Sequence, residues 1–303
     1  MTVEPHYHDE FGNYDIDTGS YTAINWKTPR SRDSWANLFN KMSQARTEAE
    51  WRSVMDDETD RKAAIIHINN HNREEWLERV GDNDLHYREI RYSEPYGGFA
   101  HEFSPTDKSD PNRITYSVIA ENSDVADKMK EAELEMQGHE RHDTVGKLLG
   151  FPDCCRQFFL DDWIDGSIRD PMYEISCNTP SSECINGDRN KVLVKEPNDG
   201  VNIMWRYFGI AFNTHMPCSW ECEESVELAR NRYRIMNENG YGDEADLIHK
   251  WISQPMNWSG YHGQAHIQNS HVTSKVNSSC YLEEKEVVWK EDYDVLARES
   301  DGC

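Results

Sequence analysis

The feature that most constrains how this chain can fold is a set of cysteines concentrated in one segment. The chain has eight cysteines, and six of them fall between positions 154 and 222. Two pairs stand out, Cys154–Cys155 in LLGFPDCC and Cys218 with Cys222 in HMPCSWEC, and each pair closely follows a proline. If both pairs serve one site, the fold must bring together sulfur atoms that are distant in the sequence.

Both cysteine pairs are predicted to lie at the start of a helix, because proline suits the first helical turn. On a helix, Cys218 and Cys222 are four positions apart and share a face, so both sulfurs can reach one ion. The positive end of the helix dipole lowers the pKa of a thiol and favours the thiolate form that binds metals. Adjacent cysteines project in different directions, so Cys155 is favoured over Cys154 as a third ligand.

Further ligands and alternatives are open at this stage. His215 precedes Cys218 by three positions and is a candidate ligand, and Cys177 and Cys184 lie in the segment 166–200, predicted to be a long loop that could complete or cover the site. Thiolates with a histidine suit Zn²⁺, whereas three thiolates with an open position suit an iron–sulfur cluster. Thiol–disulfide chemistry and inert, buried core cysteines are the competing readings.

A second group of candidate residues is WSGYHGQAHIQNSH, which contains His262, His266 and His271. Imidazole titrates near neutrality, so such histidines can act as general acids or bases. His262, which follows a Trp-Ser-Gly turn, is predicted to be the catalytic candidate. His266 and His271 are predicted to be surface or hydrogen-bonded residues of a hairpin. His139 and His142, which precede the first cysteine pair, are predicted to be solvated.

Composition bears on partners and location. The chain of 303 residues has 56 acidic and 32 basic residues, for a net charge of −24. Dispersed acidic residues are typical of halophilic proteins and disfavour nonspecific binding to nucleic acids. No apolar run approaches the ~20 residues that span a bilayer, and the first residues lack a signal-peptide pattern. We therefore expect a cytoplasmic protein, where cysteines serve metal or redox chemistry more often than structural disulfides.

The hydrophobic pattern predicts an α+β fold in three segments. Residues 1–33 are predicted to be an extended arm and 34–122 a small α/β unit. Residues 123–303 are predicted to be a mainly helical cysteine-motif domain with a late β-hairpin. Alternating or apolar runs predict strands at 62–69, 85–92 and 113–121, and a hairpin within 263–276.

Three segments together resemble a known family. VGKLLGFPDCCRQFF, HMPCSWECEESVELA and MNWSGYHGQAHIQ are similar to the LLGYP-x-CC, H-x-PCS-x-x-C and WS-x-x-HG segments of an uncharacterised, largely archaeal and bacterial domain-of-unknown-function family. They occur in the family's order and cover about residues 139–275. The resemblance implies no activity, but by position it marks six residues, namely Cys154, Cys155, His215, Cys218, Cys222 and His262.

The sequence thus predicts an intracellular metal-binding protein, most simply a metalloenzyme. Cys155, Cys218 and Cys222 would hold zinc or an iron–sulfur cluster with help from Cys154 or His215. His262 would act in the same pocket on an unknown small molecule or protein partner. The alternative is a structural protein of a larger assembly, such as a virus particle, in which the cysteine site only stabilises the fold.

Overall fold

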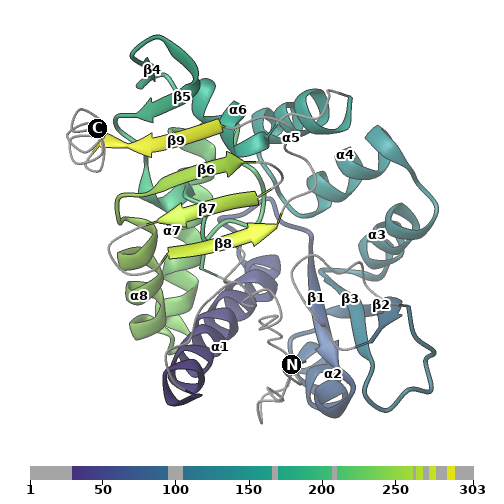
Figure 1. The fold of residues 1–303 in the computed structure, drawn as a ribbon. Coiled ribbons are helices and arrows are strands. Elements are labelled where there is room, and N and C mark those ends of the chain that lie inside the picture. Colours follow the sequence, from purple (N-terminus) through teal and green to yellow (C-terminus); the bar gives the residue numbers. More distant parts are fainter. Residues whose placement is uncertain are drawn as a thin grey trace. The chain divides into compact units, whose positions relative to one another are not determined.

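The computed structural model describes residues 29–94, 105–165, 170–206, 210–261, 264–268, 273–277 and 285–290. Its chain divides into two compact units, which are taken separately below. The first unit consists of Met1–Arg156 with Asn231–Ala245, and the second of Gln157–Arg230 with Asp246–Cys303. Helices and two separate sheets confirm the predicted α+β class (Figure 1). The predicted segment boundaries at 34 and 123 stay predictions.

The first unit is built on a three-stranded antiparallel sheet in the order β1-β3-β2. All three strands are confirmed within about one or two residues of the predicted ranges. They are β1 (Ala63–Asn69), β2 (His86–Ser93) and β3 (Ile114–Ala120). The register of β2 shifts between Glu89 and Arg91, so this strand carries a bulge.

Four helices begin and end within the first unit, namely α1 (Pro29–Arg52), α2 (Arg73–Asp82), α3 (Ser123–Leu134) and α4 (Gly138–Leu148). Helix α1 begins at Pro29, so the extended arm predicted up to residue 33 is wrong for its last five positions. Proline is accepted in the first helical turn, which explains the early start. Residues 1–28 lie outside the described residues. Asn122 caps α3 by accepting a hydrogen bond from the Val125 amide at 2.9 Å.

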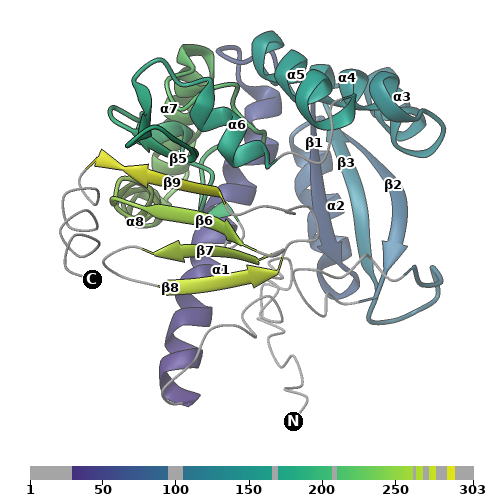
Figure 2. The same ribbon diagram turned by 45° about the horizontal axis from the view of Figure 1, so that its top comes forward.

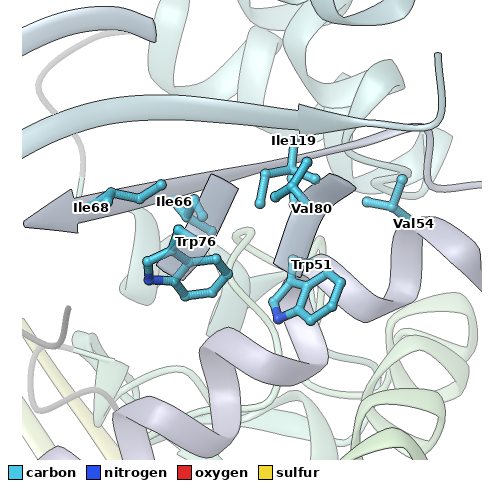
Figure 3. Close-up of a cluster of buried hydrophobic side chains, with 8 residues drawn as sticks. Trp51, Val54, Ile66, Ile68, Trp76, Val80 and Ile119 are labelled. Atoms are coloured by element: carbon cyan, nitrogen blue, oxygen red, sulfur yellow. The ribbon is translucent and has the colours of Figure 1, made fainter. Parts of the chain in front are cut away.

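The two faces of this sheet are covered by different helices, because successive strand residues point to opposite faces. Side chains from α1, α2 and the adjoining turn pack on one face in a cluster made of Trp51, Val54, Ala64, Ile66, Ile68, Trp76, Val80 and Ile119 (Figure 3). On the other face, Val118 and Ile90 pack with Met129 of α3 and with Leu148 at the end of α4. The sheet is therefore buried on both sides along most of its length.

The second unit contains a six-stranded sheet in the order β4-β5-β9-β6-β7-β8 (Figure 1). Only the pairing of β5 with β9 is parallel among these described strands. The predicted hairpin is confirmed as β7 and β8, but it forms one edge of this larger sheet. The strands are β4 (Ser182–Ile185), β5 (Asp188–Val194), β6 (Asn257–Tyr261), β7 (Gln264–Gln268), β8 (Thr273–Asn277) and β9 (Lys285–Trp289).

The long loop predicted for 166–200 is wrong. The described part of this segment holds α6 (Pro171–Cys177) and the hairpin of β4 and β5. Asn186 and Gly187 adopt φ values of 52° and 76°, which suit a tight two-residue hairpin turn. Asp170 caps α6 by accepting a hydrogen bond from the Met172 amide. The polar and glycine residues of this segment therefore mark caps and turns.

The unit boundaries fall inside three helices, α5 (Asp153–Phe159), α7 (Glu223–Glu238) and α8 (Gly242–Ile252). The core of the second unit is rich in tryptophan. The rings of Trp205 and Trp251 lie 5.4 Å apart edge to face, and Trp220 lies 5.8 Å from Trp289. The segment after residue 200 adds further buried residues to this core, namely Val201, Ile203, Met204, Trp205, Ile210, Ala211 and Phe212.

Candidate metal centre

Four cysteine sulfurs come together in the folded chain. The Sγ atoms of Cys154, Cys155, Cys218 and Cys222 all lie within 4.8 Å of one another. The prediction that the two cysteine pairs converge is therefore confirmed. The sulfurs of Cys154 and Cys155 are 3.8 Å apart. Around a tetrahedral zinc ion with Zn–S bonds of about 2.3 Å, neighbouring sulfurs are also separated by about 3.8 Å. The group thus has the dimensions of a site for one metal ion.

Cys154 and Cys155 are positioned by the first turn of α5. This helix begins at Asp153 directly after Pro152, as the proline predicted, and the Arg156 amide donates to the Pro152 carbonyl at 2.9 Å. Cys155 is 1% exposed, whereas Cys154 is exposed. The first turn leaves backbone amides without intrahelical partners, and it therefore stabilises thiolates placed there.

The loop that leads into α5 is fixed by backbone contacts within the first unit. Gly150 has φ +67°, and a Cβ added there would lie 2.9 Å from the Cα of Arg61. The amide of Phe151 donates to the Gly146 carbonyl at 2.9 Å, and the amide of Lys62 donates to the Leu148 carbonyl at 3.0 Å. Only glycine fits this approach at position 150, which explains why a glycine precedes the cysteine pair.

Cys218 and Cys222 lie in a turn, because α7 begins at Glu223 and not at Pro217. The proposed helical spacing of these two cysteines is therefore wrong, although their sulfurs do meet. The Cys222 amide donates to the Ser219 carbonyl at 3.3 Å, and the Cys222 carbonyl accepts from Val226 in the first turn of α7. A turn of this kind brings two side chains four positions apart to the same side.

Sequence reasoning missed the residue that anchors this turn, Trp220. Its side chain is fully buried. Its backbone amide donates to Thr179 Oγ1 at 2.9 Å, its indole Nε1 donates to Ser176 Oγ at 2.8 Å, and its carbonyl accepts from the Asn198 amide. The signal was available in CSWEC, where a large aromatic residue stands between two cysteines. Trp220 draws the turn into the core and fixes the positions of both neighbouring cysteines.

Among the predicted histidines that the structure describes, His215 is not part of the sulfur group. It is buried, and its Nε2 lies 2.8 Å from Ser225 Oγ. The predicted catalytic residue His262 lies outside the described residues, as does His271. His266 lies in β7, where it pairs in register with Ser259 and Lys275.

The two histidines before the first cysteine pair lie on α4. His139 is exposed and His142 is half-buried. Burial, followed by the neighbouring Arg141, lowers the pKa of His142. His142 is thus mainly neutral near pH 7, and neither histidine is part of the sulfur group.

Cys177 and Cys184, which were expected to complete or cover the site, are also separate from it within the described ranges. Cys177 ends α6 and Cys184 lies in β4, and both are exposed. Desolvation by the surrounding protein atoms, as the largest effect, raises the pKa of Cys177. None of the six cysteines that the structure describes forms a disulfide.

The fold and site define an α+β protein with a four-cysteine group that could hold one metal ion. None of the helices among the described residues has an apolar stretch long enough to cross a membrane. No protein-family model matches the chain, and searches of curated proteins and of solved structures found no match. The family resemblance stays a prediction, so function must be argued from the chemistry of the site.

Proposed function

We propose that this chain binds one Zn²⁺ ion through the thiolates of Cys154, Cys155, Cys218 and Cys222, and that the ion stabilises the fold. The observation that carries the proposal is the mutual distance of the four sulfurs, none more than 4.8 Å from another. Four cysteine thiolates in a tetrahedron are a standard ligand set for structural zinc.

The compactness of the group favours a single ion over an iron–sulfur cluster. In a cluster, the cysteine ligands bind different iron atoms around a core that also contains inorganic sulfide. Such ligands stand farther apart than ligands that share one ion. The spread of at most 4.8 Å, and the 3.8 Å between Cys154 and Cys155, match a shared ion.

The number of ligands favours a structural role over a catalytic one. Catalytic zinc sites have three protein ligands and keep one position for water or substrate, whereas structural sites are closed by four. A closed set also matches the burial of Cys155 and Cys222, which are 1% and 7% exposed. The metalloenzyme with His262 as acid or base is the alternative proposal, and it requires one of the four thiolates to leave the ion.

Metal analysis tests the proposal directly. We expect protein purified without oxygen to contain about one equivalent of zinc and no inorganic sulfide. The Cys222→Ser variant should lose the zinc, and the matched variant Cys177→Ser should keep it, since Cys177 lies outside the group. Finding stoichiometric iron together with sulfide would identify an iron–sulfur cluster in place of the proposed zinc ion. Finding less than about 0.2 equivalents of any transition metal in the wild type would contradict any metal site.

Cobalt substitution distinguishes a structural zinc site from a catalytic one. Co²⁺ in place of zinc should show thiolate charge-transfer absorption and the visible bands of a tetrahedral ion. Adding azide or imidazole should leave this spectrum unchanged, because a closed site has no free position. A spectrum that responds to azide would support the catalytic alternative.

We further propose that the protein works in a reducing compartment such as the cytoplasm. None of the six described cysteines is in a disulfide, which supports this setting, since disulfides form in oxidising compartments. Thiol counting on protein extracted under acid quench should find the cysteines reduced or metal-bound. Disulfides in freshly quenched protein would contradict the proposed compartment without contradicting the zinc site.

A further inference from the structure

The side chain of Arg156, the residue directly after the first cysteine pair, ties the start of α5 to α4. Residues 149–152 connect these two helices in the first unit, as Figure 2 shows. The Arg156 Nε donates to Asp143 Oδ1 of α4 at 3.2 Å. Its Nη1 donates to the carbonyl of Phe151 at 2.9 Å and to Asp153 Oδ1 at 2.6 Å. One guanidinium therefore contacts α4, the connecting loop and the first residue of α5.

Gly146 of α4 leaves the space that the Arg156 side chain fills. Gly146 is buried and lies three positions after Asp143, on the same face of the helix. A Cβ added at position 146 would lie 2.6 Å from the Cδ and 3.1 Å from the Cγ of Arg156. The Arg156 side chain is only 12% exposed. Glycine weakens a helix interior, and the close approach of Arg156 gives a physical reason for its presence here.

Arg156 also balances charge beside the cysteine ligands. Asp153 directly precedes Cys154, and a carboxylate next to thiolates adds to their mutual repulsion. The ion pair of Asp153 with Arg156 places a positive charge at this carboxylate. The Asp153 side chain is 89% exposed, so solvent screens this effect. The hydrogen bonds of Arg156 to Asp143 and Phe151 are therefore its larger contribution.

We propose that Arg156 is a positioning residue for the cysteine metal site, an inference that rests on the proposed binding of zinc. Cys154 and Cys155 lie in the first turn of α5, between the connecting loop and Arg156. The contacts of Arg156 hold this turn against α4 and keep the backbone of both cysteines in place. Arg156 is not itself a ligand, because a guanidinium offers only hydrogen-bond donors. It acts through the two cysteines that it positions.

A ligand pair that is held in place before the metal binds increases the affinity for the metal. Ligands that are mobile in the metal-free protein lose conformational freedom on binding, and this loss weakens the binding. Residues that orient the ligands of a metal site typically contribute about ten- to a hundredfold to metal affinity. Because Arg156 makes three hydrogen bonds from one largely buried side chain, its contribution should lie in this range.

Competition between the full chain and a chelator for Zn²⁺ measures this contribution. Arg156→Ala should bind Zn²⁺ about ten- to a hundredfold more weakly than the wild type. Arg156→Lys keeps the charge but loses the planar fork, so it should bind Zn²⁺ with intermediate affinity. This second variant keeps the experiment decisive if Arg156→Ala does not fold.

Gly146→Ala separates positioning of the ligands from stabilisation of the fold. Alanine favours a helix interior more than glycine does, so the substitution by itself supports α4. The new Cβ would nevertheless displace the Arg156 side chain, because it would lie 2.6 Å from the Arg156 Cδ. We expect Gly146→Ala to bind Zn²⁺ more weakly than the wild type, in the same direction as Arg156→Ala. If Arg156 only stabilised the fold, the zinc affinity of the folded variants would equal that of the wild type.

The matched control is Lys147→Ala. Lys147 pairs with the same Asp143 carboxylate at 2.5 Å, but this ion pair lies within α4 and the lysine side chain is 57% exposed. Its removal should change the zinc affinity by less than about twofold. Zinc binding by the wild type with undiminished affinity in the Arg156 variants, or equal losses in Arg156→Ala and Lys147→Ala, would overturn the role of Arg156 alone. Absence of zinc binding by the wild type would overturn the zinc site and this role with it.

Discussion

The apolar cluster around Trp51 and Trp76 and the four-cysteine group both bring together residues that are distant in the sequence, but different forces hold them. In the apolar cluster, two indole rings meet edge to face at 6.1 Å with isoleucine and valine side chains around them (Figure 3). Removal of this surface from water is sufficient to stabilise it. The cysteine group brings together four ionisable side chains, two of them buried, whose thiolates need a cation to hold them together.

The difference lies in charge. Four thiolates within 4.8 Å would repel one another strongly, and a bound cation would offset this repulsion. Metal binding would then couple folding to pH and to metal concentration. The apolar cluster has no such dependence. The comparison therefore predicts that the same treatment, metal removal or acid, affects the two sites unequally.

The largest expected effect follows from removing one ligand. Cys222→Ser should release the zinc and lower the free energy of unfolding by on the order of 5 kcal/mol, because the binding energy of a structural zinc ion contributes directly to folding. Thermal unfolding with and without a chelator measures this. The chelator should destabilise the wild type strongly and Cys222→Ser hardly at all. If the chelator lowered the thermal stability of the wild type and of Cys222→Ser equally, the cysteine group would not depend on a bound metal ion, and the proposed difference from the apolar cluster would be wrong.

The elements of the first unit could be predicted from the sequence because their signals are local. KAAIIHIN places apolar side chains on both faces, and β1 is buried from Ala63 to Asn69 except at the half-buried Ile65 and the exposed His67. Helix α3 has the same local character, because DVADKMKEAEL is rich in helix-forming residues and Asn122 caps it through the Val125 amide. Such features depend on neighbours within a few residues.

The cysteine turn could be predicted only in part. The spacing of the motifs indicated that the pairs converge, but the start of α7 was placed too early. What holds residues 217–222 out of a helix is Trp220, whose bonds go to Thr179 and Ser176 about forty positions upstream. His215 was a reasonable ligand by position, yet it contacts Ser225. These outcomes depend on tertiary contacts, which local patterns do not contain.

The second-largest expected effect comes from a substitution in the apolar cluster. Trp76 is 1% exposed, so Trp76→Ala should lower the free energy of unfolding by about 3–5 kcal/mol through lost burial and a cavity. Zinc content should stay at one equivalent, because the substitution touches no ligand. Chemical denaturation and metal analysis of the same sample measure both. The control is Leu134→Ala, since Leu134 is 51% exposed and should change stability by less than about 0.5 kcal/mol.

The third effect concerns the loop that leads to the first cysteine pair. Gly150 and Gly138 both have positive φ, but only at Gly150 would a Cβ meet backbone, namely the Arg61 Cα at 2.9 Å. Gly138→Ala should cost about 1 kcal/mol of left-handed strain. Gly150→Ala should cost about 3 kcal/mol, since Arg61 must also shift. Equal losses in the two variants, measured by denaturant unfolding, would show that the loop yields freely and does not fix α5.

The smallest expected effect is the stability that the protein loses in acid when the ion pairs of Glu89 in the first unit are broken. This loss can be measured separately from the loss caused by release of a metal ion. Partial burial alone would raise the pKa of Glu89, but hydrogen bonds from Lys108, Tyr92 and Arg73 outweigh it and lower the pKa to about 2. A carboxylate with a lowered pKa stabilises the fold fully above its unfolded value of about 4.5, and this stability is lost as the pH falls from there toward 2. After solvent screening, the contribution is about 1–2 kcal/mol.

Glu89→Gln should therefore destabilise the protein by this amount near pH 7 and by progressively less below pH 4.5. The comparison is best made in metal-free protein, because acid also returns protons to the cysteine thiolates and releases the ion. A difference between wild type and Glu89→Gln that stays constant from pH 7 to pH 3 would contradict the assignment. A difference that shrinks in this window places the pH dependence at the ion pairs of Glu89, and whatever acid sensitivity remains only in the metal-loaded protein belongs to the cysteine group.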